Sequence, residues 1–289
     1  MTLPSAYLGI ELGGTTTVVA LCTDLEAITF ETRDEFDTSS PQEVFARIKD
    51  FVRDWSIKAI GVAAFGPVII DPLDPLYGTI TTTPKVTFQN CSLIEHLSPI
   101  CKNIFIDTDV NAAAIAEHKI RLQKGKDVPL LKYITVGTGI GIGSSSCPPI
   151  PSFNAEGGHI MTPLFEEDVT AGFSGICPYH SSCVEGMTSS LALAKRAGIE
   201  SWQLPHADDC VFDAAVHYLA HLCINSVLLN RPNVIVLGGG VMKREGLYER
   251  IIKKFDDLMN GYLTGVKGSD VLQQQLLESG IVGSFMIIN

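Results

Sequence analysis

Residues 6–22, AYLGIELGGTTTVVALC, form a pattern that predicts a β-hairpin near the start of the chain. The runs AYLGIEL (6–12) and TTVVALC (16–22) are rich in the apolar and β-branched residues that strands prefer. Gly13-Gly14 between them supplies the backbone freedom that a tight turn needs. A second unit of this kind, LKYITVGTGIGIGSSS, spans residues 131–146. Two glycine-turned strand pairs in different halves indicate two related lobes that face each other.

Helical patterns alternate with predicted strands, which indicates an α/β protein. Ser40 and Pro41 are suited to the start of a helix over residues 39–55, and apolar residues then recur at helical spacing. Further helices are predicted over 111–124, 213–230 and 245–259, and further strands over 59–66, 103–110 and 234–240. We expect a small lobe over residues 1–117, a large lobe over 118–277, and a final segment, 278–289, that packs back on the small lobe.

The composition excludes several classes of function. The chain has 289 residues, 46% of them hydrophobic, and a formal net charge of -11, which disfavours a nucleic-acid surface. The start resembles no signal peptide, and the longest uncharged run, 133–155, is broken by glycine, serine and proline. We therefore expect a cytoplasmic protein without a membrane span. Its eight cysteines are then expected to be thiols or metal ligands rather than disulfides.

Three glycine clusters could approach a ligand closely: Gly13-Gly14-Thr15, Gly137-Thr138-Gly139 and Gly238-Gly239-Gly240. Such turns can aim several backbone N–H groups at a phosphate, and a threonine hydroxyl adds another donor. Each cluster taken alone is better explained as a plain tight turn. A P-loop motif is absent, and Ile142 stands where a dinucleotide fingerprint needs its third glycine.

The stretch FIDTDVNAAA (105–114) places two carboxylates at the end of a predicted buried strand. Ligands of α/β folds favour this end of a strand, where a carboxylate can accept a proton from a substrate hydroxyl. We assign the chemical role to Asp109 and a supporting role to Asp107. The alternative is that one aspartate only caps the following helix. Asn111 could either contact a substrate or act as the cap.

The stretch CPYHSSC (177–183) carries the spacing of three zinc ligands, Cys177, His180 and Cys183. Zinc prefers tetrahedral sulfur and nitrogen ligands, so a fourth ligand is needed. The alternative is a loop with ordinary thiols.

Seven motifs occur in the order found in the ROK family of sugar kinases, which the chain resembles from about residue 7 to 245. They are LGIELGGT (8–15), GVAAFGP (61–67), IDTDVNAAAIAE (106–117), YITVGTGIGIG (133–143), EGGHI (156–160), CPYHSSCVEG (177–186) and VIVLGGGV (234–241). The resemblance implies the two-lobed sugar kinase/Hsc70/actin-like (ribonuclease H-like) fold with a central cleft. It also implies an ATP-dependent hexose kinase that forms a homodimer.

The resemblance further implies roles for individual residues. Asp109 falls on the catalytic base, and Asn111, Glu156, His159 and Glu185 fall on positions that contact or flank the sugar. The first two glycine clusters fall on the phosphate turns, the third falls on the adenosine side, and Glu11 falls where Mg²⁺ is handled. His159 becomes the fourth ligand of a structural Zn²⁺, beside Cys177, His180 and Cys183.

Within this family the chain is most similar to bacterial-type fructokinases. Thr108 in DTDVN (107–111) and the segment YGTITTTPK (77–85) resemble that branch, which implies D-fructose as the substrate. Kinases of glucose, mannose or N-acetylhexosamines remain alternatives, as does a sugar-sensing regulator. Thr16 replaces a common lysine and Glu278-Ser279 replaces a common Asn-Ala, departures that bear on nucleotide affinity and oligomer contacts.

Overall fold

A computed structural model of the chain describes residues 3–149 and 155–288. Its strands are β1 (Ser5–Leu12), β2 (Thr16–Cys22), β3 (Thr32–Asp37), β4 (Ser56–Ala64), β5 (Thr79–Ile80), β6 (Cys91–Ser92), β7 (Ile104–Thr108), β8 (Leu130–Val136), β9 (Ile140–Ser146), β10 (Val234–Gly238) and β11 (Leu272–Gln274). Its helices are α1 (Pro41–Phe51), α2 (Leu93–Leu97), α3 (Asp109–Gln123), α4 (Glu166–Ala171), α5 (Val184–Thr188), α6 (Ser190–Ala197), α7 (Asp213–Asn230), α8 (Leu247–Met259), α9 (Gly268–Val271) and α10 (Ser279–Met286).

The first sheet has five strands in the order β3-β2-β1-β4-β7. The predicted hairpin is confirmed, because β1 and β2 pair antiparallel from Tyr7–Cys22 to Leu12–Thr17. β4 and β7 then run parallel to β1, so their carboxyl ends lie at the same edge of the sheet. One face of this sheet packs on α1, whose predicted N-cap, Ser40, accepts a hydrogen bond from the Glu43 N–H.

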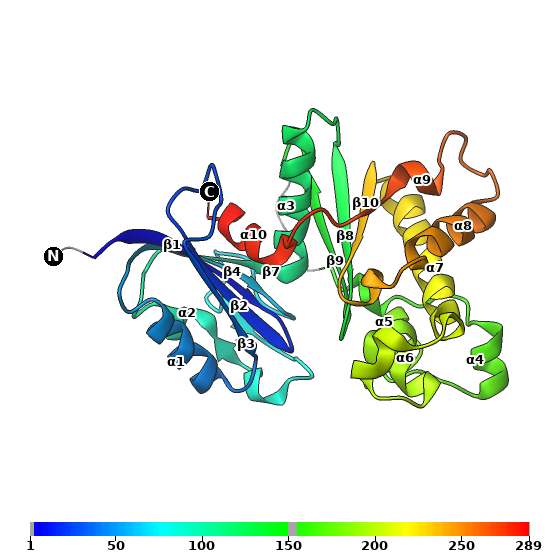
Figure 1. The fold of residues 1–289 in the computed structure, drawn as a ribbon, viewed down its shortest axis with the longest axis horizontal. Coiled ribbons are helices and arrows are strands. Elements are labelled where there is room, and N and C mark those ends of the chain that lie inside the picture. Colours follow the sequence, from blue (N-terminus) through cyan, green and yellow to red (C-terminus); the bar gives the residue numbers. More distant parts are fainter. Residues whose placement is uncertain (1–2, 150–154, 289) are drawn as a thin grey trace.

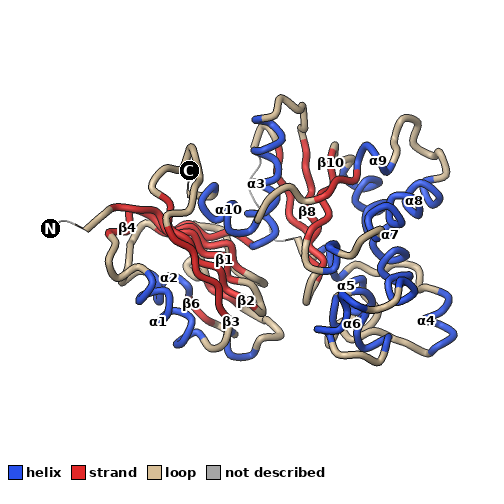
Figure 2. Tube along the Cα trace, viewed as in Figure 1, coloured by secondary structure: helices blue, strands red, loops and turns tan. Residues whose placement is uncertain are grey.

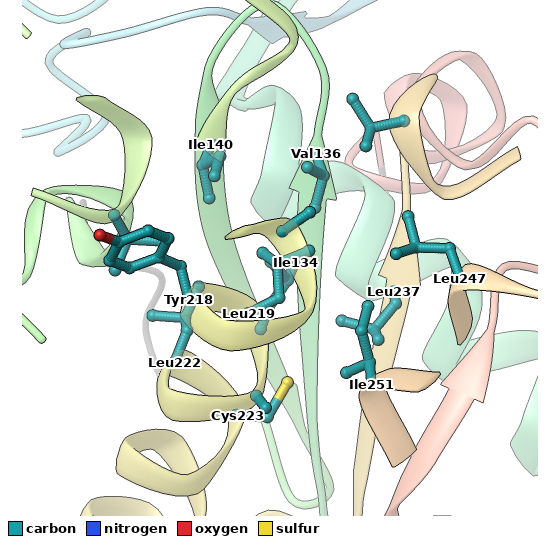
Figure 3. Close-up of a cluster of buried hydrophobic side chains, with 14 of the residues drawn as sticks. Ile134, Val136, Ile140, Tyr218, Leu219, Leu222, Cys223, Leu237, Leu247 and Ile251 are labelled. Carbon is teal, nitrogen blue, oxygen red and sulfur yellow. The ribbon is translucent and has the colours of Figure 1, made fainter. Parts of the chain in front are cut away.

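The second sheet has four strands in the order β11-β10-β8-β9 and repeats the opening hairpin in β8 and β9. Its core lies between the sheet and the helices α7 and α8, as Figure 3 shows for Ile134, Leu219, Leu237 and Ile251. The helices predicted over 213–230 and 245–259 are the ones that cover this face.

Two helices, α3 and α10, lie between the two sheets (Figure 1). Figure 2 shows that the chain after β11 returns toward the first sheet, where α10 begins. Ile281 and Phe285 of α10 are buried together with Val18 and Ala20 of β2. Gly61 of β4 allows this close packing, because a Cβ there would lie 1.7 Å from the Ser284 carbonyl oxygen. The lobe boundary near residue 117 stays a prediction.

Within the described residues, one helical stretch, Asp209–Asn230, has the length and hydropathy of a membrane-crossing helix. Its 18-residue window has a mean hydropathy of 1.3, and 56% of that window is buried inside the protein. Because α7, the major part of this stretch, packs under the second sheet, its apolar residues are explained as core.

Candidate active site

Asp109 lies where β7 ends and α3 begins, at the carboxyl edge of the first sheet. The helix starts two residues earlier than the sequence predicted, because Thr108 is its N-cap. The Thr108 hydroxyl accepts a hydrogen bond from the Asn111 N–H at 3.1 Å. Neither aspartate nor Asn111 therefore caps the helix, and that alternative is wrong. The Asp109 carboxylate accepts a hydrogen bond from the Val110 N–H at 2.8 Å.

The surroundings of Asp109 make it a weak acid. Burial raises the pKa of Asp109 to about 7, and the negative charges of Glu11 and Glu156 contribute to the rise. Burial also raises the pKa of Glu11, which lies on β1. A carboxylate that titrates near neutral pH is suited to accept a proton from a hydroxyl. Asp109 on α3 is thus acted on by the negative charges of a second carboxylate on β1 and a third in the loop before Gly157.

Asn111 joins the ends of two sheets through its side-chain amide. Its Nδ2 donates to Asp107 Oδ1 at 2.8 Å, and its Oδ1 accepts from the Ser144 N–H of β9 at 3.2 Å. Asn111 is buried, and so is Asp107, which also accepts from the Thr108 N–H at 2.7 Å. The supporting role predicted for Asp107 fits this contact. The sugar contact implied for Asn111 stays a prediction.

The first two glycine turns contact each other, although they belong to different sheets. Thr15 Oγ1 and Thr138 Oγ1 lie 3.2 Å apart although 123 residues separate them in the chain. Both clusters are hairpin turns, closed by hydrogen bonds from Gly13 N–H to the Thr16 oxygen and from Gly137 N–H to the Gly139 oxygen. A Cβ built on Gly14 or Gly137 would meet no atom within 4 Å. Packing therefore does not explain these glycines, whereas a ligand approaching the backbone would.

The third cluster, Gly238 to Gly240, begins at the last residue of β10 and lies beside the end of β8. Gly239 has a φ of +91°, and a Cβ there would lie 2.5 Å from the Val136 carbonyl oxygen. The fold alone thus requires glycine at this position. A Cβ at Gly240 would meet nothing within 4 Å, so this end of the cluster is open. Because Val136 directly precedes Gly137, the third turn lies next to the second.

Glu185 connects the second turn to the predicted zinc loop. Its Oε2 accepts a hydrogen bond from the Ile140 N–H at 2.9 Å. Its Oε1 lies 3.8 Å from His159 Nε2. Glu156 is exposed and lies directly before the short 3-10 helix Gly157–His159. The predicted sugar-side residues Glu156, His159 and Glu185 therefore belong to one region of the molecule.

The four predicted zinc ligands, His159, Cys177, His180 and Cys183, come together. Their ligand atoms all lie within 4.8 Å of one another. His159 Nδ1 lies 3.4 Å from Cys183 Sγ and 3.7 Å from Cys177 Sγ, which is 3.8 Å from His180 Nδ1. A tetrahedron with zinc–sulfur and zinc–nitrogen bonds of ordinary length has edges of about 3.3–3.8 Å. The cluster is thus compatible with zinc, and His159 Nε2 stays free to face Glu185.

A model of the ROK family matches residues 7–289 of the chain. The chain belongs to the ROK family. It is 37% identical to a fructokinase of Pediococcus pentosaceus over 258 residues, which cover 88% of this chain and 86% of that protein. It is 36% identical to a fructokinase of Streptococcus mutans over 264 residues, with 89% and 87% covered.

A solved ROK structure supports the fold assignment. The ROK hexokinase of Thermus thermophilus superimposes with a TM-score of 0.73, at 22% identity, over 98% of this chain and 97% of that one. The predicted fold class, the two-lobed α/β fold of the actin-like group, is confirmed.

Thr38, which was not among the predicted site residues, braces the first turn of this ROK protein. Its hydroxyl donates to the Gly13 oxygen at 2.7 Å and contacts the Thr17 hydroxyl at 2.7 Å. Its N–H donates to the Thr15 oxygen at 2.8 Å. Thr38 stands between β3 and α1 in an ordinary polar stretch, so no periodicity or motif distinguished it.

Proposed function

We propose that this ROK protein is an ATP-dependent hexose kinase that phosphorylates D-fructose at its 6-hydroxyl. The geometry around Asp109 carries the proposal: a half-buried carboxylate with a pKa of about 7 lies at the start of α3. Val110, the next residue, packs against β9 just beyond the second glycine turn. The named relatives are fructokinases at 36–37% identity over most of the chain, which supports fructose as the sugar.

In the proposed reaction Asp109 accepts the proton of the sugar 6-hydroxyl. The oxygen then forms a bond to the γ-phosphorus of ATP while the bond from that phosphorus to the β,γ-bridging oxygen breaks, releasing ADP. Phosphoryl transfer depends on positioning and on stabilising charge around the phosphates. The N–H group of Gly14 and the hydroxyls of Thr15 and Thr138 would donate to those phosphates. The cluster Gly238–Gly240 would flank the adenosine side.

Asn111, Glu156, His159 and Glu185 are the proposed sugar-side residues. Glu185 and His159 are held by contacts of their own, to the Ile140 N–H and to the cysteine sulfurs. Groups that are already oriented lose less freedom when a ligand binds, which favours sugar affinity. Thr108, which resembles the fructokinase branch, fixes the helix that carries Asp109 and Asn111.

Two metal ions are part of the proposal. Zn²⁺ would be held by His159, Cys177, His180 and Cys183, whose spacing fits it, and would supply a structural cross-link rather than a reactive position. Mg²⁺ would be held near Glu11, where burial and neighbouring acidic charges already disfavour ionisation of Glu11 and Asp109. A divalent cation there would supply positive charge beside the phosphates. The homodimer and the cytoplasmic location stay predictions.

A coupled assay of ADP release with fructose, mannose, glucose and N-acetylglucosamine tests the proposal. We expect the highest kcat/KM with fructose. Asp109→Asn should lower kcat by roughly three orders of magnitude, within the range for loss of a general base. Calorimetry should show that the variant still binds the sugar. Asp257→Asn on α8, an exposed aspartate, serves as the control.

Two outcomes would contradict the proposal. A higher kcat/KM for glucose than for fructose would show that Thr108 does not indicate fructose as the substrate. A kcat of Asp109→Asn close to that of the unmodified protein would place the base elsewhere.

A further inference from the structure

The C-terminal helix α10 begins directly at the Glu11 carboxylate. A Cβ built on Gly280 would lie 2.2 Å from Glu11 Oε1 and 2.7 Å from Glu11 Oε2. The backbone of Ile281, the next residue, forms a hydrogen bond with the same carboxylate. Real Cβ atoms do not approach oxygen this closely, so any side chain at position 280 would displace the Glu11 carboxylate.

The start of α10 is also fixed to α3, the helix that carries Asp109. Ser279 Oγ donates to Glu117 Oε1 at 2.6 Å, and the Leu276 N–H donates to the same oxygen at 2.9 Å. Glu117 is fully buried two turns after Asp109 on α3. One short segment therefore contacts both the strand that carries Glu11 and the helix that carries Asp109.

Glu11 lies close enough to Asp109 for its negative charge to act on that carboxylate, so the position of Glu11 matters. Glu278, Arg33 and Glu35 are the charged groups that act on Glu11 itself. Glu278 directly precedes α10 and pairs with Arg33 at 3.4 Å, so the charge around Glu11 also depends on where the C-terminal segment lies.

We propose that α10 positions the Glu11 carboxylate relative to Asp109, with Gly280 leaving the space that carboxylate occupies and Ser279 tying the helix to α3. The proposal rests on the proposed function, because it assigns positioning residues for the same site. Its consequence is that the C-terminal segment, although distant in sequence from every motif of the site, controls the phosphate side of the reaction.

Gly280→Ala is the direct test, and it is expected to fold. The atoms that a new Cβ would meet are the tip of the Glu11 side chain, which can rotate away without moving the backbone. We expect little change in Tm, an unchanged sugar Kd by calorimetry, and a fall in kcat of about tenfold or more, as for a misplaced group in an active site. The sugar Kd should hold because the sugar-side residues are untouched.

Gly283→Ala is the matched control on the same helix. A Cβ at Gly283 would lie 2.1 Å from the backbone oxygen of Ala112 and does not involve Glu11. Because a backbone must yield, we expect a clear fall in Tm, with a smaller loss of kcat per folded molecule than in Gly280→Ala. Gly280→Ala should thus mainly lower kcat, whereas Gly283→Ala should mainly lower Tm.

The double variant Glu11→Asp/Gly280→Ala separates a specific contact from general damage. The shorter aspartate leaves room for the new methyl group. The kcat of the double variant, relative to the unmodified protein, should therefore be higher than the product of the relative kcat values of the two single variants. A Gly280→Ala variant with kcat within about twofold of the unmodified protein would overturn the proposal. Equal kcat losses in both glycine variants, or no recovery in the double variant, would also overturn it.

Two controls keep the outcome clear. If Gly280→Ala does not fold, Ser279→Ala replaces it, and an unchanged kcat in that variant then overturns the proposal. If the unmodified protein phosphorylates no hexose, the proposed function fails first. The same double-variant cycle, measured as the calorimetric Kd of Mg·ATP instead of kcat, still decides whether Gly280 and Glu11 are coupled.

Discussion

At the scale of the residue, Asp109 combines a chemical role with a cost in stability. Its pKa is raised to about 7 by burial and by the charges of Glu11 and Glu156, whereas an unfolded aspartate titrates near 3.8. The folded protein therefore binds more protons than the unfolded chain between these values. The contribution of Asp109 to the free energy of unfolding therefore falls as the pH rises from about 4 to about 7. The reason is that the folded protein loses its bound proton as the pH passes the pKa of folded Asp109.

Asp109→Asn, which should lose most of its activity, should consequently be more stable than the unmodified protein. We expect a gain in the free energy of unfolding of roughly 1–3 kcal/mol at pH 8, which falls toward zero near pH 4. Urea denaturation at both pH values measures it. A variant that is less stable at pH 8 would show that the carboxylate is not held in an unfavourable place.

Asp107→Asn is the matched comparison two residues away, and it should lower the free energy of unfolding rather than raise it. The Asp107 carboxylate accepts hydrogen bonds from the Asn111 amide and the Thr108 N–H. Replacing a charged acceptor by a neutral one should cost about 1 kcal/mol. Equal effects of the two substitutions would contradict the separate roles assigned to the neighbouring aspartates.

The residue scale also shows what the sequence could predict about the site. The spacing in CPYHSSC predicted three ligands, and the family motif EGGHI supplied the fourth, because both are short local patterns. The spacing could not predict that Glu185 meets the Ile140 N–H, because that contact joins residues 45 positions apart. The same limit applies to Thr38 and to Gly280, whose partners lie on other elements.

At the scale of the element, the loop from Cys177 to Cys183 should depend on zinc. Protein purified without chelators should contain about one zinc per chain, and Cys177→Ala should lose it, because three ligands hold the ion much less tightly. We expect a lower Tm and a higher sugar Kd for this variant, since His159 would lose its anchor. Metal analysis, thermal denaturation and calorimetry measure the three effects.

Cys210→Ala is the control for the zinc loop, because Cys210 is exposed and outside the cluster. It should keep zinc, Tm and sugar affinity. Unmodified protein that contains no zinc would remove the metal from the proposal, and an unchanged sugar Kd in Cys177→Ala would remove the link to His159.

The elements differ in how well their sequences predicted them. The strands β1 and β2 have strong apolar patterns and were predicted to within one residue. The strands β8 and β9 together match the predicted glycine-turned unit, residues 131–146, to within one residue at its ends. The strand β3, TRDEFD, is an edge strand with charged side chains, and such a composition gives no strand pattern. The helix α7 was predicted with correct bounds because apolar residues recur along its whole length.

At the scale of the whole molecule, the two lobes could be inferred from the repeated hairpin, but their connection could not. The connection consists of α3, α10 and the segment between β11 and α10, and its contacts join residues more than 150 positions apart. At the centre of these contacts is an ion pair between Glu117 and Arg121 on α3. Arg121 also donates to the Gln273 side chain and to the Gln274 oxygen.

Arg121→Met should therefore destabilise the whole molecule. Both partners of the pair are almost completely buried, and removing one partner of a buried pair costs about 3–5 kcal/mol, because the other charge stays buried. The midpoint of urea denaturation measures the loss. Lys253→Met is the matched control, because Lys253 and Asp257 form an ion pair with the same spacing on α8 but are exposed, so the change should be about 0.5 kcal/mol or less.

The double variant Glu117→Gln/Arg121→Met tests the cause of that loss. The new amide side chain at position 117 would keep a carbonyl oxygen to accept from Ser279 and the Leu276 N–H, and it would leave no charge buried. The double variant should therefore be more stable than Arg121→Met alone, although it lacks more of the native contacts. If instead the losses add, the charge of Glu117 is not what makes Arg121 necessary, and the connection between the lobes depends on the hydrogen bonds of Arg121 to Gln273 and Gln274.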